Sequence, residues 1–447
     1  MQQNVKINRL PGQGRILLLA WLTYTLAYTL RVNIAVVIPV LVREHHFTFA
    51  QMGVLTSCYF VAYMLGQLVS GYLGDRLSSK LLIISGLIVS ALCNIGMSFM
   101  PSLRVLYLLW TINGLAQSML WAPLMKTLSV WFAGFQLERV SFLMAQSVIV
   151  GYAVSWVLSS LLTAYLGWIY AFIVPAVMVL VFVVSLIILF EDAAPDADKR
   201  SEINQTIVTQ SDQTDRRGQG SGHVVESVSD QTAGAQEHDV SVGAFFRMIQ
   251  LPLLLVISIC HGLIREGISV WFPTILEDAA KISLQNTIMI LIIVPLVNFA
   301  GIILVKKVNR HLSRDSLKTL LSVFGGMAII TLLLLVLFSS SFWIVILMIV
   351  LLLALANGLT PILTSVIPFQ FARYRKVALT VGVLDFAIYL GAAVSGVLTG
   401  VVADHFDWIG VVSLWLIAAI IGFATAIWQS FGQRGKQRYE QKIHDAE

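Results

Sequence analysis

Long apolar runs, separated by short polar stretches, follow one another along almost the whole chain. A helix needs about 20 apolar residues to cross the roughly 30 Å hydrocarbon core of a bilayer, and these runs reach that length. Only helices and closed barrels satisfy their backbone hydrogen bonds in lipid. We therefore predict an all-α polytopic membrane protein.

Charged residues make up only 12% of the 447 residues, whereas soluble domains contain about 25%. The apolar runs predict twelve transmembrane helices in two groups of six. The first six lie near 15–41, 50–74, 81–100, 103–131, 138–165 and 168–190, and the second six near 250–277, 284–306, 316–338, 342–370, 376–403 and 408–431.

The stretch between the two groups is polar and rich in Asp, Gln, Ser, Thr and Gly. It cannot bury enough apolar surface to offset the entropy lost on ordering, so we predict a flexible linker. The expected organisation is a six-helix bundle over 1–190, the linker over 191–243, a second six-helix bundle over 244–431 and a tail over 432–447.

The distribution of Lys and Arg predicts the orientation of the chain, because the cytoplasmic loops of membrane proteins are enriched in these residues. If the N-terminus is cytoplasmic, 24 of the 29 basic residues lie on the cytoplasmic side. We therefore expect a protein of the cell (plasma or inner) membrane with both termini and the linker in the cytoplasm. The net charge of +5 is then a topology signal, and it gives no support to nucleic-acid binding.

Two arginines interrupt the apolar runs. Arg31 lies about 16 residues into the first predicted span and Arg265 about 15 residues into the seventh, so at about 1.5 Å per residue both lie near mid-bilayer. An arginine near a helix end can reach the headgroups, but a charge at the bilayer centre costs at least about 2.5 to 3.5 kcal/mol. This cost indicates a functional role for both residues.

Polar residues accompany each arginine. Tyr24, Tyr28 and Arg31 are spaced i, i+4 and i+7, which places them on one helix face. His261 lies one turn before the second arginine. Glu266 points about a sixth to a third of a turn away from it, and we expect it to face a neighbouring helix or the cavity edge as a local counter-charge. Two guanidinium groups that converge on a central cavity suit a phosphate or a carboxylate, because guanidinium binds such groups with two parallel hydrogen bonds.

The stretch "GYLGDRLSSK" at 71–80 lies between the second and third predicted spans. It resembles the loop motif of the major facilitator superfamily: Gly71, Asp75, Arg76 and Lys80 match, and two serines replace the usual Gly and Arg. An ordinary charged turn is the alternative. The resemblance implies the major facilitator fold of two six-helix bundles, with Asp75 as a gating latch at the cytoplasmic helix ends that does not touch substrate.

Three further stretches resemble the organophosphate:phosphate antiporters of that superfamily, the glycerol-phosphate and hexose-phosphate carriers. They are "YTLAYTLRVNIAVVIP", "QSMLWAPLMKTLSVWF", which contains Trp121, and "LIREGISVWFPTIL". The resemblance implies that Arg31 and Arg265 hold the phosphate group. The part "RVNIAVV" also resembles the anion:cation symporters that carry organic acids, so this part alone does not separate the two groups.

The chain departs from the antiporters at several positions. The antiporters usually carry a His in the fifth helix, where "MAQSVIVGYAVSW" has none. Asp385 replaces a small residue in the eleventh helix, and Gln67 replaces a residue in the second helix that is often basic. The site has thus lost positive charge and gained an acid. His261 either substitutes for the missing imidazole or packs between helices. Tyr59, Tyr63 and Gln67, spaced i, i+4 and i+8, either line the cavity or pack between helices.

These residues predict a secondary transporter of small anionic, phosphorylated metabolites that works by alternating access and anion exchange. Two unpaired arginines would keep the empty site from reorienting until an anion neutralises them. The alternative is a proton-coupled organic anion symporter in which Asp385, Glu266 or His261 carries the proton. A third hypothesis is a membrane sensor of a sugar phosphate, against which the short tail counts.

No catalytic motif or nucleotide-binding loop stands out in the sequence, so we expect no enzyme activity and no cofactor. Cys58, Cys93 and Cys260 lie inside predicted spans at unrelated spacing, and they imply neither a disulfide framework nor a metal site. The stretch "ADHFDW" at 403–408 is more typical of a solvated loop than of a metal site. The expected partners are the small anionic substrate and the lipid bilayer, and we expect the protein to act as a monomer.

Overall fold

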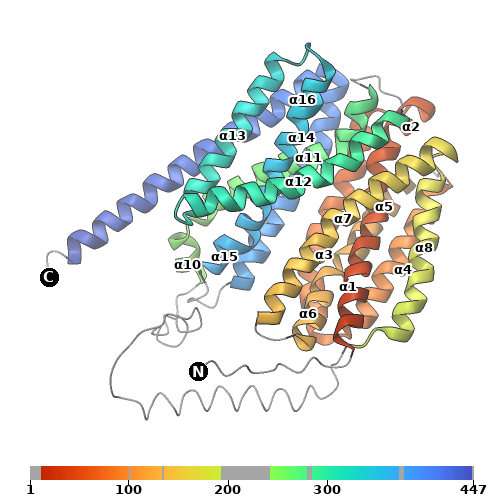
Figure 1. Ribbon diagram of the computed structural model, residues 1–447, viewed down its shortest axis with the longest axis horizontal. Coiled ribbons are helices and arrows are strands. Elements are labelled where there is room, and N and C mark those ends of the chain that lie inside the picture. Colours follow the sequence, from red (N-terminus) through yellow and green to blue (C-terminus); the bar gives the residue numbers. More distant parts are fainter. Residues whose placement is uncertain are drawn as a thin grey trace, which may run out of the picture.

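The computed structural model describes residues 12–99, 102–132, 135–192, 242–278, 284–371 and 377–444. Within these ranges all regular structure is helical, as predicted. The helices form two neighbouring groups, one containing α1 to α8 and the other containing α10 to α16 (Figure 1). Nearly all of the predicted linker lies outside the described residues, so the domain boundaries at its ends stay predictions.

The first group differs from the sequence-based prediction at two helix breaks. Its elements are α1 (Gln13–Thr29), α2 (Asn33–His45), α3 (Phe49–Arg76), α4 (Ser79–Ser98), α5 (Leu103–Ser118), α6 (Trp121–Trp131), α7 (Phe135–Tyr165) and α8 (Tyr170–Leu189). The predicted span 15–41 corresponds to α1 and α2, which are separated at residues 30–32, and the predicted span 103–131 is divided into α5 and α6.

The second group ends in a long helical element with a sharp turn. Its elements are α10 (Val242–Met248), α11 (Leu251–Asp278), α12 (Leu284–His311), α13 (Ser316–Val336), α14 (Phe342–Pro361), a π-helical turn (Ile362–Val366), α15 (Ile367–Phe369) and α16 (Val377–His444). The backbone of α16 turns at Asp407, where φ is 55°, between the eleventh and twelfth predicted spans. Ten helical stretches of the described residues are long and apolar enough to cross a membrane, and one of them, Leu379–Phe431, contains this turn. The count of twelve spans stays a prediction.

The outer faces of the helices carry large apolar side chains. Ile188 of α8, Leu296 of α12 and Trp343 of α14 are 71%, 69% and 67% exposed. A soluble protein rarely exposes so much contiguous apolar surface. These faces suit contact with lipid chains, because apolar side chains are favourable in hydrocarbon and a helix satisfies the hydrogen bonds of its own backbone.

Helix α3 of the first group packs antiparallel against α16 of the second. Near the middle of both helices, Tyr63 contacts Tyr389 with ring centroids 4.7 Å apart. Further along, a Cβ added to Gly53 would collide with the backbone oxygen of Gly396, so glycine is what allows the two backbones to touch. This backbone contact lies at the Gly53 end of the helix pair.

The beginning of α3 is capped by a residue of the other group. The Asp404 carboxylate accepts hydrogen bonds from the backbone N–H groups of Phe49 at 2.9 Å and Ala50 at 2.8 Å, which have no partner within their own helix. At the same end, Nη1 of Arg43 lies 3.7 Å from the carboxylate of Glu277. The two groups are thus joined at the end of the molecule that the predicted topology places outside the cell.

Candidate functional site

Arg31 lies at the break between α1 and α2. The backbone N–H groups of Leu30 and Arg31 donate to the carbonyl groups of Ala27 and Tyr28, three residues back, at 3.1 and 3.2 Å. This turn is therefore tighter than an α-helix. The arginine that it presents is only 6% exposed.

Three amide side chains from neighbouring helices donate hydrogen bonds to carbonyl groups of this turn. Asn94 of α4 and Asn113 of α5 donate to the carbonyl oxygen of Leu30 at 3.0 and 2.9 Å. Gln117 of α5 donates to the carbonyl oxygen of Ala27 at 3.0 Å. All three amides are buried. Because a buried carbonyl without a partner is costly, these amides stabilise the break and so fix the position of the arginine.

The guanidinium of Arg31 is surrounded by aromatic rings. Its Cζ atom lies 4.8 to 5.8 Å from the centroids of five rings, within the range of cation–π attraction. The rings belong to Tyr28, Tyr59, Phe60, Tyr63 and Tyr389. Among the described residues its side chain has no ion pair and no hydrogen-bond partner. The π faces therefore stabilise the charge, and no carboxylate of the described residues forms an ion pair with it.

Arg265 lies in the middle of α11 and is paired with its neighbour in sequence. Its Nη2 group donates to Oε1 of Glu266, and its Nη1 group donates to the hydroxyl of Thr360 in α14 at 3.3 Å. Its buried Nε has no partner within the described structure. Nε2 of His261, a fully buried residue, lies 3.2 Å from the same hydroxyl. The hypothesis of two unpaired arginines is therefore wrong for Arg265, because two long side chains on adjacent helical positions can bend far enough to meet.

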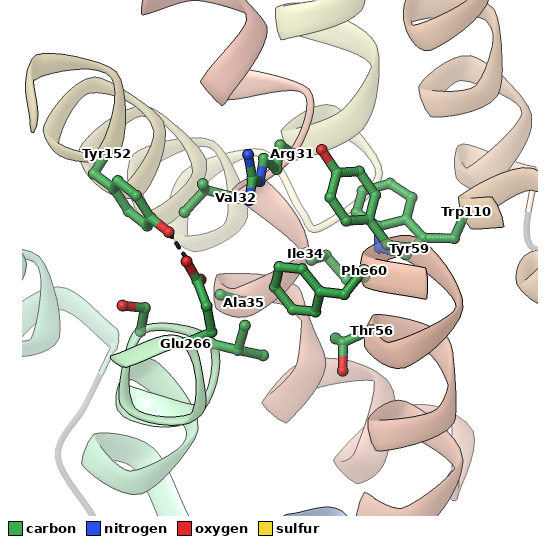
Figure 2. A pocket seen from close by; sticks show the side chains of 12 residues that line it. Arg31, Val32, Ile34, Ala35, Thr56, Tyr59, Phe60, Trp110, Tyr152 and Glu266 are labelled. Atoms are coloured by element: carbon green, nitrogen blue, oxygen red, sulfur yellow. Dashed lines mark hydrogen bonds between the residues drawn. The ribbon is translucent and has the colours of Figure 1, made fainter. Parts of the chain in front are cut away.

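A small cavity of about 20 Å³ is lined by residues of both helix groups, among them Arg31, Tyr59, Tyr152 and Glu266 (Figure 2). In this view Arg31 lies between Tyr152 and Tyr59. The Tyr152 hydroxyl of α7 donates to Oε2 of Glu266 at 3.2 Å. The Glu266 carboxylate thus joins the two helix groups and presents a negative charge to the same cavity as Arg31.

Asp385 of α16 adds a second carboxylate close to the cavity. It is partly exposed and lies within hydrogen-bonding reach of the Gln67 side chain of α3 and within electrostatic range of both arginines. One turn further along α16, Tyr389 contacts Arg31. The centre of the molecule therefore holds two guanidinium groups and two carboxylates.

The sequence-predicted residues largely gather at this centre. Tyr28 and Tyr63 contact the guanidinium of Arg31 directly. Tyr24 lies one ring further away, with its ring centroid 5.5 Å from that of Tyr28 and 4.6 Å from that of Trp121. Whether these residues bind a substrate stays a prediction.

Sequence reasoning missed Tyr152, Thr360 and Tyr389 as members of the site. Tyr389 follows Asp385 at i+4, and this shared helix face is the signal that could have found it. Tyr152 and Thr360 carry no such signal, because each reaches the site only through the packing of its helix, α7 or α14, against other helices.

The loop motif is only partly described. The backbone of α3 includes Gly71 and Asp75, but their side chains lie outside the description, so the gating role stays a prediction. Arg76 is exposed at the end of α3. The backbone N–H of Lys80 donates to Asp192 at 2.7 Å, which ties the beginning of α4 to the chain that follows α8.

The stretch 403–408 lies in α16 at its turn, where Asp404 caps α3, and so it is more than a solvated loop. Among the described residues, no group of three His, Cys, Asp or Glu side chains could hold a metal ion.

Comparison with known proteins gives a family match over most of the chain. The family model described as Major Facilitator Superfamily matches residues 20–368. A solved structure of a bacterial homolog to the human lysosomal transporter Spinster, in an inward-facing and occupied conformation, has a TM-score of 0.67 at 13% sequence identity, and the match covers 95% of this chain and 97% of that one. At this identity the likeness shows the fold alone.

Curated relatives match over shorter stretches. The phosphoglycerate transporter protein of Salmonella typhimurium is 30% identical over 190 residues, which are 41% of this chain and 41% of that protein. The glycerol-3-phosphate transporter of Bacillus subtilis is 32% identical over 110 residues, 24% of each chain. The membrane sensor protein UhpC of Salmonella typhimurium is 28% identical over 118 residues, 26% of this chain and 27% of that protein. The matched stretches thus span less than half the length of each relative.

Proposed function

This chain belongs to the major facilitator superfamily, and on that premise we propose that it is a secondary active transporter of small anionic, phosphorylated metabolites. It is an integral membrane protein whose two helix groups are joined at one end. In the proposed mechanism these groups rock about the central site, which opens to one side of the membrane at a time, and one anion is exchanged for another.

The observation that carries this proposal is the state of Arg31. Its guanidinium is buried at the centre of the molecule, touches five aromatic rings and has no negative partner among the described residues. A buried charge without a counter-charge is costly, so the site favours a ligand that supplies one. A phosphate or carboxylate also matches the forked geometry of guanidinium.

Exchange follows from the same charge. While the site is empty, the unpaired guanidinium opposes the closure that would bury it further, and a bound anion removes this cost. The carrier therefore reorients far more readily when an anion is bound than when the site is empty. This is the behaviour of an exchanger. The relatives named as phosphoglycerate and glycerol-3-phosphate transporters support a phosphorylated substrate.

Proton-coupled symport of an organic anion is the second candidate, and the carboxylates of the site favour it. Glu266 neutralises Arg265, and Asp385 lies within electrostatic range of both arginines. If all four groups are ionised, the centre has no net charge, and an incoming anion makes it negative. A proton taken up with the anion by Asp385 or Glu266 restores the balance, as in other membrane-embedded acids of transporters.

The chain's placement in the cell is part of the proposal. The excess of Lys and Arg on one side supports a plasma or inner membrane location with both termini and the 191–243 linker in the cytoplasm. One chain supplies both walls of the central cavity, which supports a monomer as the working unit.

Thermal unfolding of the purified protein across a panel of ligands tests the proposal. The panel contains glycerol phosphates, hexose phosphates, phosphoglycerate, inorganic phosphate and organic acids, with the matching neutral polyols as controls. An anion at about 100 times its Kd adds about 2.7 kcal/mol to the free energy of unfolding, whereas the neutral polyols leave it unchanged. If no anion stabilises the protein more than its neutral counterpart, the proposed function is wrong. Uptake into proteoliposomes then separates a carrier from a sensor.

A further inference from the structure

Glu266 occupies an unusual position for an anion-binding site, because it is a carboxylate on the wall of the cavity that contains the unpaired guanidinium. Both Arg31 and Glu266 line this cavity (Figure 2). Glu266 is only 2% exposed, so its charge is poorly screened by solvent. Any anion that approaches Arg31 in the cavity therefore also meets this negative charge.

The Glu266 carboxylate is held in place from two directions. Its Oε1 atom accepts a hydrogen bond from Arg265 of the same helix, and its Oε2 atom accepts one from Tyr152 of the other helix group at 3.2 Å. A carboxylate has about four lone-pair positions, so about two acceptor positions remain after these contacts. They can receive hydrogen-bond donors of a ligand.

A simple anion and a hydroxylated anion differ in how they meet this arrangement. The acid group of either ligand pairs with Arg31. If the rest of the ligand is apolar, the Glu266 carboxylate faces the bound acid group across the cavity with no hydrogen-bond donor between them. The two like charges then repel each other. A hydroxyl group beside the acid donates to Glu266 and converts this repulsion into a charge-assisted hydrogen bond.

We infer that Glu266 is a specificity-determining residue that selects anions carrying hydroxyl groups close to the acid group. The inference rests on the proposed function, which it narrows to phosphate esters of polyols and hydroxylated organic acids. Ser269, which also lines the cavity, donates its hydroxyl to the carbonyl oxygen of Arg265 and so does not compete for Glu266.

Matched ligand pairs test the inference on the wild-type protein without any variant. One pair is glycerol 3-phosphate and propyl phosphate, and the other is glycerate and propionate. Each pair shares its acid group and its three-carbon skeleton and differs in the hydroxyl groups. Binding is measured by calorimetry on the full chain in detergent. The hydroxylated member of at least one pair binds about tenfold more tightly or better, since a hydrogen bond to a charged group carries that much discrimination.

The variant Glu266→Gln assigns the discrimination to this side chain. An amide keeps the shape and one acceptor but removes the negative charge, so the propyl phosphate or propionate affinity rises and the ratio within the pair falls by about fivefold or more. The control is Asp385→Asn, which removes an equal charge near the site from a residue that does not line this cavity. It changes the affinity of both members of a pair in the same direction and leaves their ratio unchanged.

The outcomes separate this inference from the proposed function. If wild-type protein binds both members of each pair equally, or if Glu266→Gln leaves the ratio unchanged, Glu266 is only a structural counter-charge of Arg265 and the inference is wrong while anion transport stands. If neither pair nor any other anion binds to the wild-type protein, the proposed function itself fails, and the inference fails with it.

Discussion

At the scale of single residues, the two arginines of the site are held in opposite ways. Arg31 is surrounded by π faces and has no ion partner in the described structure, whereas Arg265 is paired with Glu266 and bonded to Thr360. An anion that binds Arg31 displaces no carboxylate from it, but it must compete with a carboxylate for Arg265. Arg31 is therefore the principal anion ligand of this account, and Arg265 is a secondary one.

Replacing each arginine by lysine tests this difference. We expect Arg31→Lys to weaken anion binding by about tenfold or more, because a compact ammonium does not reproduce two-pronged binding or the contact with five rings. Arg265→Lys has a smaller effect, since its charge is already paired. The matched control is Arg104→Lys, an exposed arginine in the first turn of α5, which leaves affinity unchanged. Affinities are measured by calorimetry, and wild-type affinity in Arg31→Lys rules out the assigned role.

Replacing Asp385 by asparagine tests coupling. If this carboxylate only compensates the positive charge of the arginines, Asp385→Asn does not abolish anion exchange. The substitution then increases anion affinity, because it removes a negative charge near the site. We expect this outcome. The measurement compares counterflow at equal pH with accumulation driven by a pH gradient in proteoliposomes. Loss of the pH-driven accumulation with intact counterflow contradicts exchange and establishes proton symport.

The sequence predicted the charged residues of the site and Glu266 as a local counter-charge, but not the aromatic and hydroxyl partners of the arginines. Arg31 and Arg265 were recognisable because a charge in a long apolar run is rare. Tyr389 and Thr360 were not, because aromatic and hydroxyl side chains are common in membrane helices and their faces are fixed only by packing between helices. The same holds for Asn94 and the other amides that bind the carbonyl groups at the helix break.

At the scale of helices, the contact between α3 and α16 determines which end of the molecule is closed. Its backbones touch at Gly53 and Gly396, and the Asp404 carboxylate caps α3 across the two helix groups. These contacts lie at the end that the predicted topology places outside, so they stabilise a state closed to the outside. They must break when the site opens there.

Replacing Asp404 by asparagine weakens this closed end. An asparagine has one acceptor oxygen, so one of the two backbone N–H groups of α3 loses its partner, at a cost of about 1 kcal/mol, and the closed population falls about fivefold relative to the open one. The readout is the distance distribution between spin labels at the exposed Glu44 and His405. The control is Asp407→Asn, a neighbouring acid at the turn of α16 that asparagine matches in size and shape. If both variants keep the wild-type distribution, the cap does not contribute to closure.

Helix positions were predictable from the sequence, whereas helix breaks were not. Apolar length alone placed the spans, because lipid demands about 20 residues for each. The break at 30–32 contains no Gly or Pro, so nothing local marks it. Pro123, four residues after Met119, is a local signal for the second break that apolar length alone does not capture. At 30–32, amide side chains of other helices stabilise the break, which makes it a product of tertiary structure.

At the scale of the whole molecule, alternating access requires two rigid groups with a site between them. The cavity lined from both groups and the cap and backbone contacts at one end fit this requirement. The major facilitator fold was predictable because the loop motif and the two sets of apolar runs are both visible in the sequence. Which end is closed was not, because it depends on contacts between helices far apart in the chain.

The orientation of the molecule is tested by a reporter inserted within 200–235, a stretch outside the described residues. The excess of basic residues on one side predicts that an enzymatic reporter active only in the cytoplasm is active at this position. The control is the same reporter inserted after His46, between α2 and α3, where we expect it to be inactive. Activity at the second site and not at the first reverses the topology.

Counterflow in proteoliposomes tests the central claim, that an anion bound at Arg31 crosses the membrane by exchange. Liposomes containing the purified protein are loaded with the anion that stabilises it best and diluted into buffer with a trace of the same labelled anion. The account predicts transient accumulation of label in wild-type liposomes, no accumulation without the internal anion, and little or none with Arg31→Lys protein that unfolds at the wild-type temperature. Absence of uptake in wild-type liposomes for every anion that binds, or equal uptake in the Arg31→Lys liposomes, contradicts it.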